Sequence, residues 1–376
     1  TAIGFYAGKN ISTGIKNTII GGNAADGLTT ASECTFVGAN AAAGQTITGN
    51  QNTSLGRYTL HNLTDGIGNT AIGSQAMLNG VVTGDYNTAV GKDAGASITS
   101  GSHNVLIGTY AGDSLATGER NTAVGNYALS AEDGDGYNTA IGYAALLAQN
   151  AGATAYNVAV GYNAGQAITT GVTNVIMGGN AGLAFTSGSD NIAIGYSALS
   201  TEDARGRSIA IGTSALSSQN AAADAYNIAI GYNAGTTVST GTHNTLVGGL
   251  AGDALTTGSH NIAIGHYTLS EEDGHGKNTA IGFAALSVQN AGADAYNVAI
   301  GFDAGQAVTT GTNNTIIGAF AGDAITTGYY NTAIGNYALG AEDAHSRNTA
   351  IGYGALSAQN AGNDAYNTAV GYLAGQ

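Results

Sequence analysis

A five-residue motif, Asn-Thr-Ala-Ile-Gly, recurs along the whole chain at nearly regular spacing. It is complete at residues 69–73, 138–142, 278–282, 331–335 and 348–352. The closing glycine occurs 22 times between Gly4 and Gly371, in steps of 17, 18 or 19 residues. A fixed period of this length indicates an array of small structural units. It therefore overrides the two or three globular domains that 376 residues would otherwise suggest.

A longer period groups these units into blocks. From Gly91 onward the steps run 17, 17, 17 and 19, so that equivalent positions recur every 70 residues. Residues 91–376 form these regular blocks, whereas residues 1–90 are less uniform. No linker separates the two parts. We therefore predict a single repeat array over residues 1–376, lengthened by duplication of a four-coil block.

Residues 157–173 serve as a template for one coil. Residues 157–161 are short, β-branched and alternating, which predicts a strand, and residues 166–170 predict a second one. Glycine and asparagine mark the turns between them. Residues 143–149 are too few for an independent helix, so a strand with a turn, or one helical turn, is expected. The fold predicted is all-β, a parallel β-solenoid of about 22 coils with 17–19 residues each, of undetermined handedness.

Two motif residues have clear backbone roles. The asparagine occupies 19 of the 21 coils that include its position, the exceptions being Cys34 and Ser208. Asparagine tolerates left-handed backbone angles, and stacked amides can bond to one another along the axis. The repeated glycine predicts positive φ or close backbone approach. A phosphate-binding loop is excluded because no Lys-Ser/Thr and no helix follow the glycines.

Aromatic residues gather just after the motif glycine. They include Tyr143, Tyr162, Tyr196, Tyr232, Phe283, Phe302, Tyr353 and Tyr372. The favoured interpretation is a ladder of rings that covers one edge of the coils. The alternative is a row of exposed rings that binds sugars.

Acidic residues concentrate in one loop of each block: Glu132, Asp133 and Asp135; Glu202 and Asp203; Glu272 and Asp273; Glu342 and Asp343. Asp133 and Asp135 could contribute to a Ca²⁺ site, which needs six to eight oxygen ligands. The third acid is replaced elsewhere by Arg205, His275 and His345. We therefore interpret these segments as solvated charged loops that protect the β surface from aggregation.

Composition narrows the classes of function. The chain carries 24 acids against 9 bases, a net charge of −15, which argues against nucleic acid and anionic membranes as partners. No run of about 18 apolar residues predicts a membrane span. The seven histidines show no metal-ligand spacing, and no serine or cysteine has the setting of a nucleophile. We assign no catalytic, cofactor-binding or metal-binding residue and predict that the protein is not an enzyme.

The motif in its longer form, residues 138–145, reads Asn-Thr-Ala-Ile-Gly-Tyr-x-Ala. It resembles the head repeats of YadA-like trimeric autotransporter adhesins. Residues 227–235, followed by Ser-Thr-Gly at 239–241, resemble the shaft repeats of bacteriophage tail fibres more closely. The resemblance covers nearly the whole chain. The coils are longer than those of adhesin heads, and no stalk, membrane anchor or chaperone domain is recognised. The resemblance implies an extracellular protein of a virion or cell surface, and a homotrimer.

A structural role follows as the first expectation: an extracellular fibre shaft that presents a receptor-binding tip. The alternative is a multivalent adhesin that binds glycans or a host surface through its repeated tyrosines and acidic loops. Ice binding is disfavoured because adjacent threonines such as Thr169 and Thr170 should point to opposite faces, and because Leu199 and Ser200 interrupt the row.

Two further expectations concern assembly. The first and last residues lie within coils, so we expect the array to continue end to end in a longer fibre. The template coil offers only Val158, Val160 and Ile168 as bulky inward residues, beside Ala and Gly. Burying them contributes roughly 1.5–3 kcal/mol each, less than the cost of ordering 17 residues at about 1–2 kcal/mol apiece. Three chains side by side would fill a shared centre with residues of the Val160 type. The alternatives are a lone solenoid that gains core by flattening and a solenoid that bundles laterally as a filament.

Overall fold

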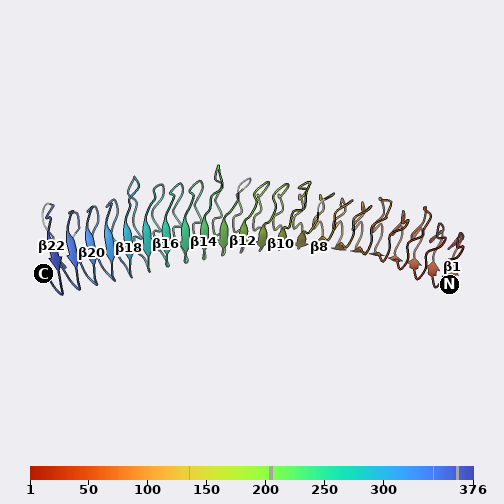
Figure 1. The fold of residues 1–376 in the computed structure, drawn as a ribbon, viewed down its shortest axis with the longest axis horizontal. Coiled ribbons are helices and arrows are strands. Elements are labelled where there is room, and N and C mark those ends of the chain that lie inside the picture. Colours follow the sequence, from red (N-terminus) through yellow and green to blue (C-terminus); the bar gives the residue numbers. More distant parts are fainter. Residues whose placement is uncertain (135, 203–205, 342, 361–363) are drawn as a thin grey trace. The chain divides into compact units, whose positions relative to one another are not determined.

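A computed structural model of the chain describes residues 1–134, 136–202, 206–341, 343–360 and 364–376. The chain forms two compact units, Thr1–Asp190 and Asn191–Gln376. Each unit is a stack of coils, and strands and turns but no helices occur among the residues described (Figure 1). The prediction of a parallel β-solenoid is thereby confirmed for each unit. The continuity of one array over the whole chain stays a prediction.

Every coil contributes one short strand, formed by the three residues between the motif asparagine and glycine, or by two of them in β1. The first unit contains β1 (Ala2–Ile3), β2 (Thr18–Ile20), β3 (Thr35–Val37), β4 (Thr53–Leu55), β5 (Thr70–Ile72), β6 (Thr88–Val90), β7 (Val105–Ile107), β8 (Thr122–Val124), β9 (Thr139–Ile141), β10 (Val158–Val160) and β11 (Val175–Met177). The second unit contains β12 (Ile192–Ile194), β13 (Ile209–Ile211), β14 (Ile228–Ile230), β15 (Thr245–Val247), β16 (Ile262–Ile264), β17 (Thr279–Ile281), β18 (Val298–Ile300), β19 (Thr315–Ile317), β20 (Thr332–Ile334), β21 (Thr349–Ile351) and β22 (Thr368–Val370).

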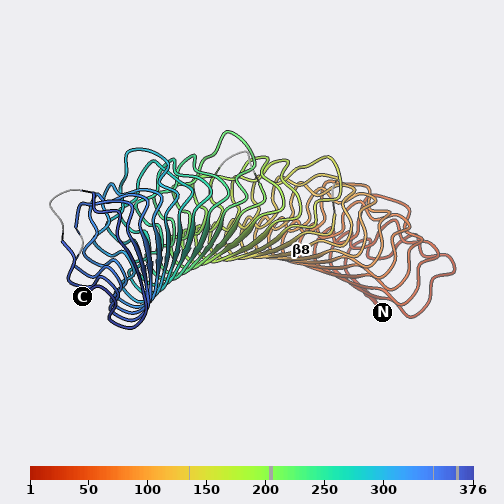
Figure 2. The same cartoon turned by 60° about the vertical axis from the view of Figure 1, so that its left-hand side comes forward.

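Neighbouring strands pair in parallel and in register with the repeat. Val158 lies opposite Val175, and Val160 lies opposite Met177. The second unit pairs in the same way, as β13 and β14 show. Within each unit the strands lie along one side of the coils and the longer loops lie along the other (Figure 2). Each motif residue therefore stacks on its own equivalent in the next coil.

The prediction of a second strand at residues 166–170 is wrong. Residues 162–167 form turns, with φ angles of 54° at Asn163 and 58° at Gly165, and residues 169–170 form a bend. The Ile168 N–H donates to the Gly165 carbonyl (3.1 Å), as in a tight turn. Successive coils are still joined here, since the Thr169 N–H donates to the Thr186 carbonyl at 2.8 Å. Turns thus stack on turns without strand geometry, and residues 143–148 also form turns.

The inward face of the strand is also different from the one expected. Ala159 is fully buried, whereas Val158 and Val160 are half-buried on the outer face of the sheet. A three-residue strand points its middle side chain one way and its two ends the other way. Ile168 is buried as expected, together with Ala164. The interior beneath the strand is therefore lined mainly by alanine, and the bulky motif residues face outward.

The asparagine ladder is confirmed. Asn157 is fully buried, and its Oδ1 accepts the backbone N–H of Asn174 at 2.9 Å. Its Nδ2 donates to the Gly171 carbonyl at 2.8 Å, which closes the coil across its interior. The two exceptions keep half of this pattern: the N–H groups of Cys34 and Ser208 donate to the preceding asparagine Oδ1 at 2.9 and 3.1 Å.

Positive φ at the motif glycine is confirmed as well. Gly161 has a φ of 143°, a conformation that residues with a side chain rarely adopt. A Cβ atom added there would lie 2.5 Å from the Gly178 carbonyl oxygen. Both the backbone angle and the close approach of the next coil require glycine at this position.

Candidate functional site

In the regular coils up to residue 325, the residue seven positions after the motif glycine places its side chain in the interior, whereas Gln359, at the equivalent position of the fourth block, is only half-buried. In two coils of a block this side chain is apolar and fully buried: Ile98, Leu115, Ile168, Phe185, Val238, Leu255, Val308 and Ile325. In the other two coils it is glutamate and then glutamine, and these are 0–1% exposed: Glu132 and Gln149, Glu202 and Gln219, Glu272 and Gln289. The interpretation of these glutamates as part of solvated loops is therefore wrong.

Among the described residues, the second acid of three of the loops matches that interpretation. Asp133, Asp273 and Asp343 are exposed, while Asp135, Asp203 and Glu342 lie outside the described residues. The sequence signal for the buried glutamates was their distance from the motif glycine. That distance aligns them with leucine, isoleucine and valine in neighbouring coils.

The buried glutamates and glutamines form hydrogen bonds with the asparagine ladder and, in the second block, with each other. Gln219 Nε2 donates to Glu202 Oε2 at 2.9 Å. Asn138 Nδ2 donates to Glu132 Oε2 at 3.3 Å, and Asn157 Nδ2 donates to Gln149 Oε1 at 2.8 Å. These bonds satisfy polar groups next to the enlarged loop of the 19-residue coil, because buried polar atoms need partners.

The third block departs from this pattern. Glu272 Oε1 accepts the backbone N–H of His275 at 3.2 Å, and Oε2 has no hydrogen-bond partner. Burial raises the pKa of Glu272 to about 7. His275 Nδ1 lies 3.7 Å from Glu272 Oε1, and ligand atoms of Glu272, Asp273 and His275 all lie within 4.8 Å of one another. The sequence interpretation that histidine lacks metal-ligand spacing overlooked this cluster.

A second feature is an aromatic groove that recurs at equivalent positions. In the first unit Tyr127 and Tyr143 meet edge to face, with ring centroids 6.1 Å apart. Tyr143 then stacks on Tyr162 at 5.4 Å. The second unit repeats this arrangement with Tyr267 and Phe283 at 6.5 Å, and again with Tyr337 and Tyr353 at 6.1 Å.

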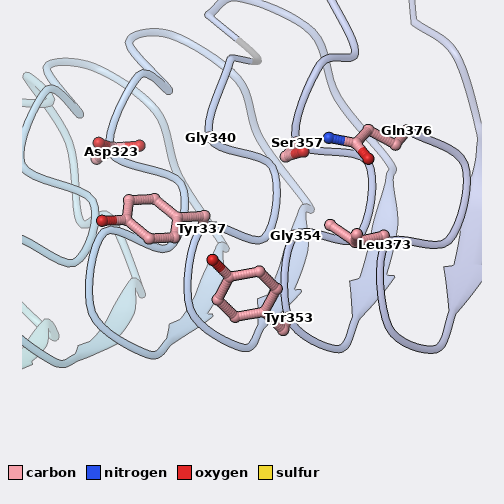
Figure 3. Close-up of a pocket in the computed structure, with 8 residues that line it drawn as sticks. All are labelled: Asp323, Tyr337, Gly340, Tyr353, Gly354, Ser357, Leu373 and Gln376. Carbon is pink, nitrogen blue, oxygen red and sulfur yellow. The ribbon is translucent and has the colours of Figure 1, made fainter.

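Each edge-to-face pair lines a groove together with residues at equivalent positions of the repeat. The first groove is lined by Tyr127, Tyr143, Ala144, Leu147 and Gln166 and has a volume of about 420 Å³. Its equivalents measure about 260 and 300 Å³, and glutamine lines them too, as Gln306 and Gln376. Figure 3 shows the rings of the last groove, with the Asp323 and Gln376 side chains above them. The grooves thus combine ring faces with amide groups.

The block between these grooves carries Ser197 and Thr213 where the others carry the two rings. Tyr196 and Tyr232 are 59% and 61% exposed, and the described residues give neither a ring partner. The predicted ladder is therefore confirmed only as short stacks, such as Phe283 on Phe302 at 5.2 Å. A second row, before the motif asparagine, was missed: Tyr226, His243 and His260 stack there, with 5.3 and 5.0 Å between centroids.

Asp253, a partly buried aspartate, gives a test of how the free energy of unfolding depends on pH. Asp253 Oδ1 is buried without a partner, and burial raises the pKa of Asp253 above its ordinary value. The equivalent residue one block earlier is Leu183. We expect Asp253→Leu to raise the free energy of unfolding at pH 7 by about 1 kcal/mol, because it removes an unpaired carboxylate. Urea unfolding followed by circular dichroism measures this change.

The expected pH dependence follows from linkage. A raised folded-state pKa adds stability that is fully present below the ordinary pKa and is lost as the pH rises through the raised value. The advantage of Asp253→Leu should therefore shrink as the pH falls from 7 toward 4. Asp294 is a control whose pH dependence has the opposite sign. The hydrogen bond that Lys277 donates to it lowers the pKa of Asp294, so the stability that Asp294 contributes is lost as the pH falls. An advantage of Asp253→Leu that grows on acidification would contradict the assignment.

Searches against models of known protein families and against curated proteins find no match to this chain. In the parts of the chain that the structure describes, no helix has the length and apolar character needed to cross a membrane.

Proposed function

We propose that this protein is a structural, non-catalytic extracellular shaft, of the tail-fibre or adhesin kind, which assembles side by side with copies of itself and presents a binding tip. The observation that carries the proposal is the outer face of each sheet. There the third strand residue is apolar in every coil, and the first is threonine, valine or isoleucine in every coil after the first.

These outer rows are accessible to a partner. In the first unit Ile107, Ile141 and Met177 are 39–42% exposed. In the second unit Ile230, Ile264 and Ile300 are 36–38% exposed. An exposed apolar surface that continues over many coils is typical of an interaction surface. Since mainly alanine lines the interior beneath the strand, burying the outer rows between chains would add apolar contact on the other face of the sheet.

A homotrimer is the assembly we propose, because three sheets can enclose these rows around a common axis. Association end to end into a longer fibre would then extend the same contacts. The extracellular location is part of this proposal and agrees with the low content of basic residues, which disfavours nucleic acid as a partner.

Charging the outer row should separate the chains. We expect the parent protein to be a trimer by light scattering and native mass spectrometry. The triple variant Ile230→Lys, Ile264→Lys and Ile300→Lys should dissociate, because three lysines would be buried without partners. The matched control places the same charges in exposed loop positions, at Ala153, Ala223 and Ala293. A stable folded monomer of the parent, or a control that dissociates equally, would contradict side-by-side assembly.

Glycan binding is a second candidate, and the recurring aromatic groove favours it. A ring face beside an amide can stack on a sugar ring and bind its hydroxyl groups. Three such grooves on one chain would allow multivalent binding by weak individual sites. A glycan array tests this candidate. The double variant Tyr127→Ser and Tyr143→Thr, which copies the residues of the second block, should give a weaker signal than the parent chain. No signal for the parent chain would remove this candidate.

A further inference from the structure

The Glu272 loop brings an unpaired carboxylate oxygen and an imidazole nitrogen together. Glu272 is 0% exposed, and its Oε2 has no hydrogen-bond partner. His275 Nδ1 is also buried without a partner and lies 3.7 Å from Glu272 Oε1. Glu272 Oε2 and His275 Nδ1 are thus two buried polar atoms of one cluster that lack partners, an arrangement that is costly unless a further group binds both.

We propose that Glu272, Asp273 and His275 form a site for a divalent transition-metal ion, with Zn²⁺ as its probe. Carboxylate oxygen and imidazole nitrogen bind zinc at about 2.0–2.2 Å, so one ion can bridge the 3.7 Å between Glu272 and His275. Asp273 is exposed and can close the remaining distance, since all three ligand atoms already lie within 4.8 Å. A fourth position remains for water.

The ligand chemistry selects the class of ion. Three protein ligands that include an imidazole suit zinc and its neighbours, whereas Ca²⁺ prefers six to eight oxygens. The site is therefore different from the Ca²⁺ site considered from the sequence at Asp133 and Asp135, of which Asp135 lies outside the described residues.

A comparison of the second and third blocks relates the hydrogen bonding of the buried glutamate to the presence of the histidine. In the second block the sequence has arginine at the position of His275, and there Glu202 Oε2 accepts a hydrogen bond from Gln219 at 2.9 Å. In the third block Glu272 instead accepts the His275 N–H, and Gln289 Nε2 has no partner. The order Glu-Asp-x-His recurs at 342–345, where Asp343 Oδ1 lies 3.9 Å from His345 Nδ1. Glu272 therefore differs from Glu132 and Glu202 in two ways: a histidine follows three residues later, and its Oε2 has no hydrogen-bond partner.

The test measures zinc bound to the full chain after dialysis at micromolar free Zn²⁺, by elemental analysis. We expect Glu272→Gln and His275→Ala each to lower the bound zinc by one equivalent per chain. The difference is independent of any ion held at 342–345. Calorimetry on the parent should show a dissociation constant at least about tenfold tighter than that of either variant for this site.

Two controls separate metal binding from a structural role of the cluster. Glu202→Gln changes an equally buried glutamate in the block without the histidine, and should leave the bound zinc unchanged. His243→Asn removes a surface histidine, at the position where Asn313 stands one block later, and should also leave it unchanged. Circular dichroism confirms that each variant is folded. A parent chain that binds no zinc, or variants that bind as much as the parent, would overturn the proposal.

Discussion

Replacing Gly248 by alanine is expected to lower the free energy of unfolding by about 3 kcal/mol or more. Gly248 has a φ of 136°, and an added Cβ would lie 2.3 Å from the Gly265 carbonyl oxygen of the next coil. Alanine would therefore combine a strained backbone with a clash against a fixed main chain. Denaturant unfolding followed by circular dichroism measures the loss.

The adjacent glycine supplies a matched control. Gly249 has no positive φ, and a Cβ there would lie 3.1 Å from the His266 ring, a side chain that can shift, and 3.9 Å from the Tyr232 carbonyl oxygen, an ordinary contact distance. Tyr162 and Tyr232 occupy the equivalent position in other coils. Gly249→Ala should therefore change stability by less than about 0.5 kcal/mol. Equal losses for the two variants would show that the motif glycine is not required by backbone geometry.

Replacing Asn157 by leucine should destabilise the chain by about 3–5 kcal/mol. The leucine would remove the acceptor of the Asn174 N–H and the donors to the Gly171 carbonyl and to Gln149 Oε1. Each of these groups is then left in the interior without its partner. The measurement is again the midpoint and slope of a urea transition.

Asn157→Ser is the control that the chain itself offers. Ser208 occupies the equivalent ladder position, where its N–H still donates to Asn191 Oδ1 and its Oγ accepts from Gln219 at 3.0 Å. The serine variant should therefore lose about half as much stability as the leucine variant. If leucine were tolerated as well as serine, the amide ladder would not hold the coils together.

The repeat itself determined much of the fold. In a solenoid each residue stacks on its own equivalent in the next coil, so a residue that recurs in sequence also recurs in space. For this reason the strand at residues 157–161, the buried ladder of Asn157 and the positive φ of Gly161 could be predicted without coordinates. Each depends on local chemistry and on one neighbouring copy.

The tertiary structure decided which side of the coil is the interior. A strand of three residues has too few alternations to show whether Ala159 or its flanking valines face inward, and the bulkier pair was wrongly placed inside. The prediction of a second strand at residues 166–170 was wrong for a related reason. The positive φ at Asn163, which places a turn just before this stretch, is not fixed by residue type.

The candidate metal site also depends on which side chains face the coil interior. A loop rich in acids predicts solvent-exposed side chains. Glu272 is nevertheless buried, because it stacks at the position that the buried Leu255 occupies one coil earlier. Only the closed path of the coil turns that residue inward while leaving Asp273 outside. Local sequence sets the period of the array, whereas burial depends on the path that the chain takes between one strand and the next.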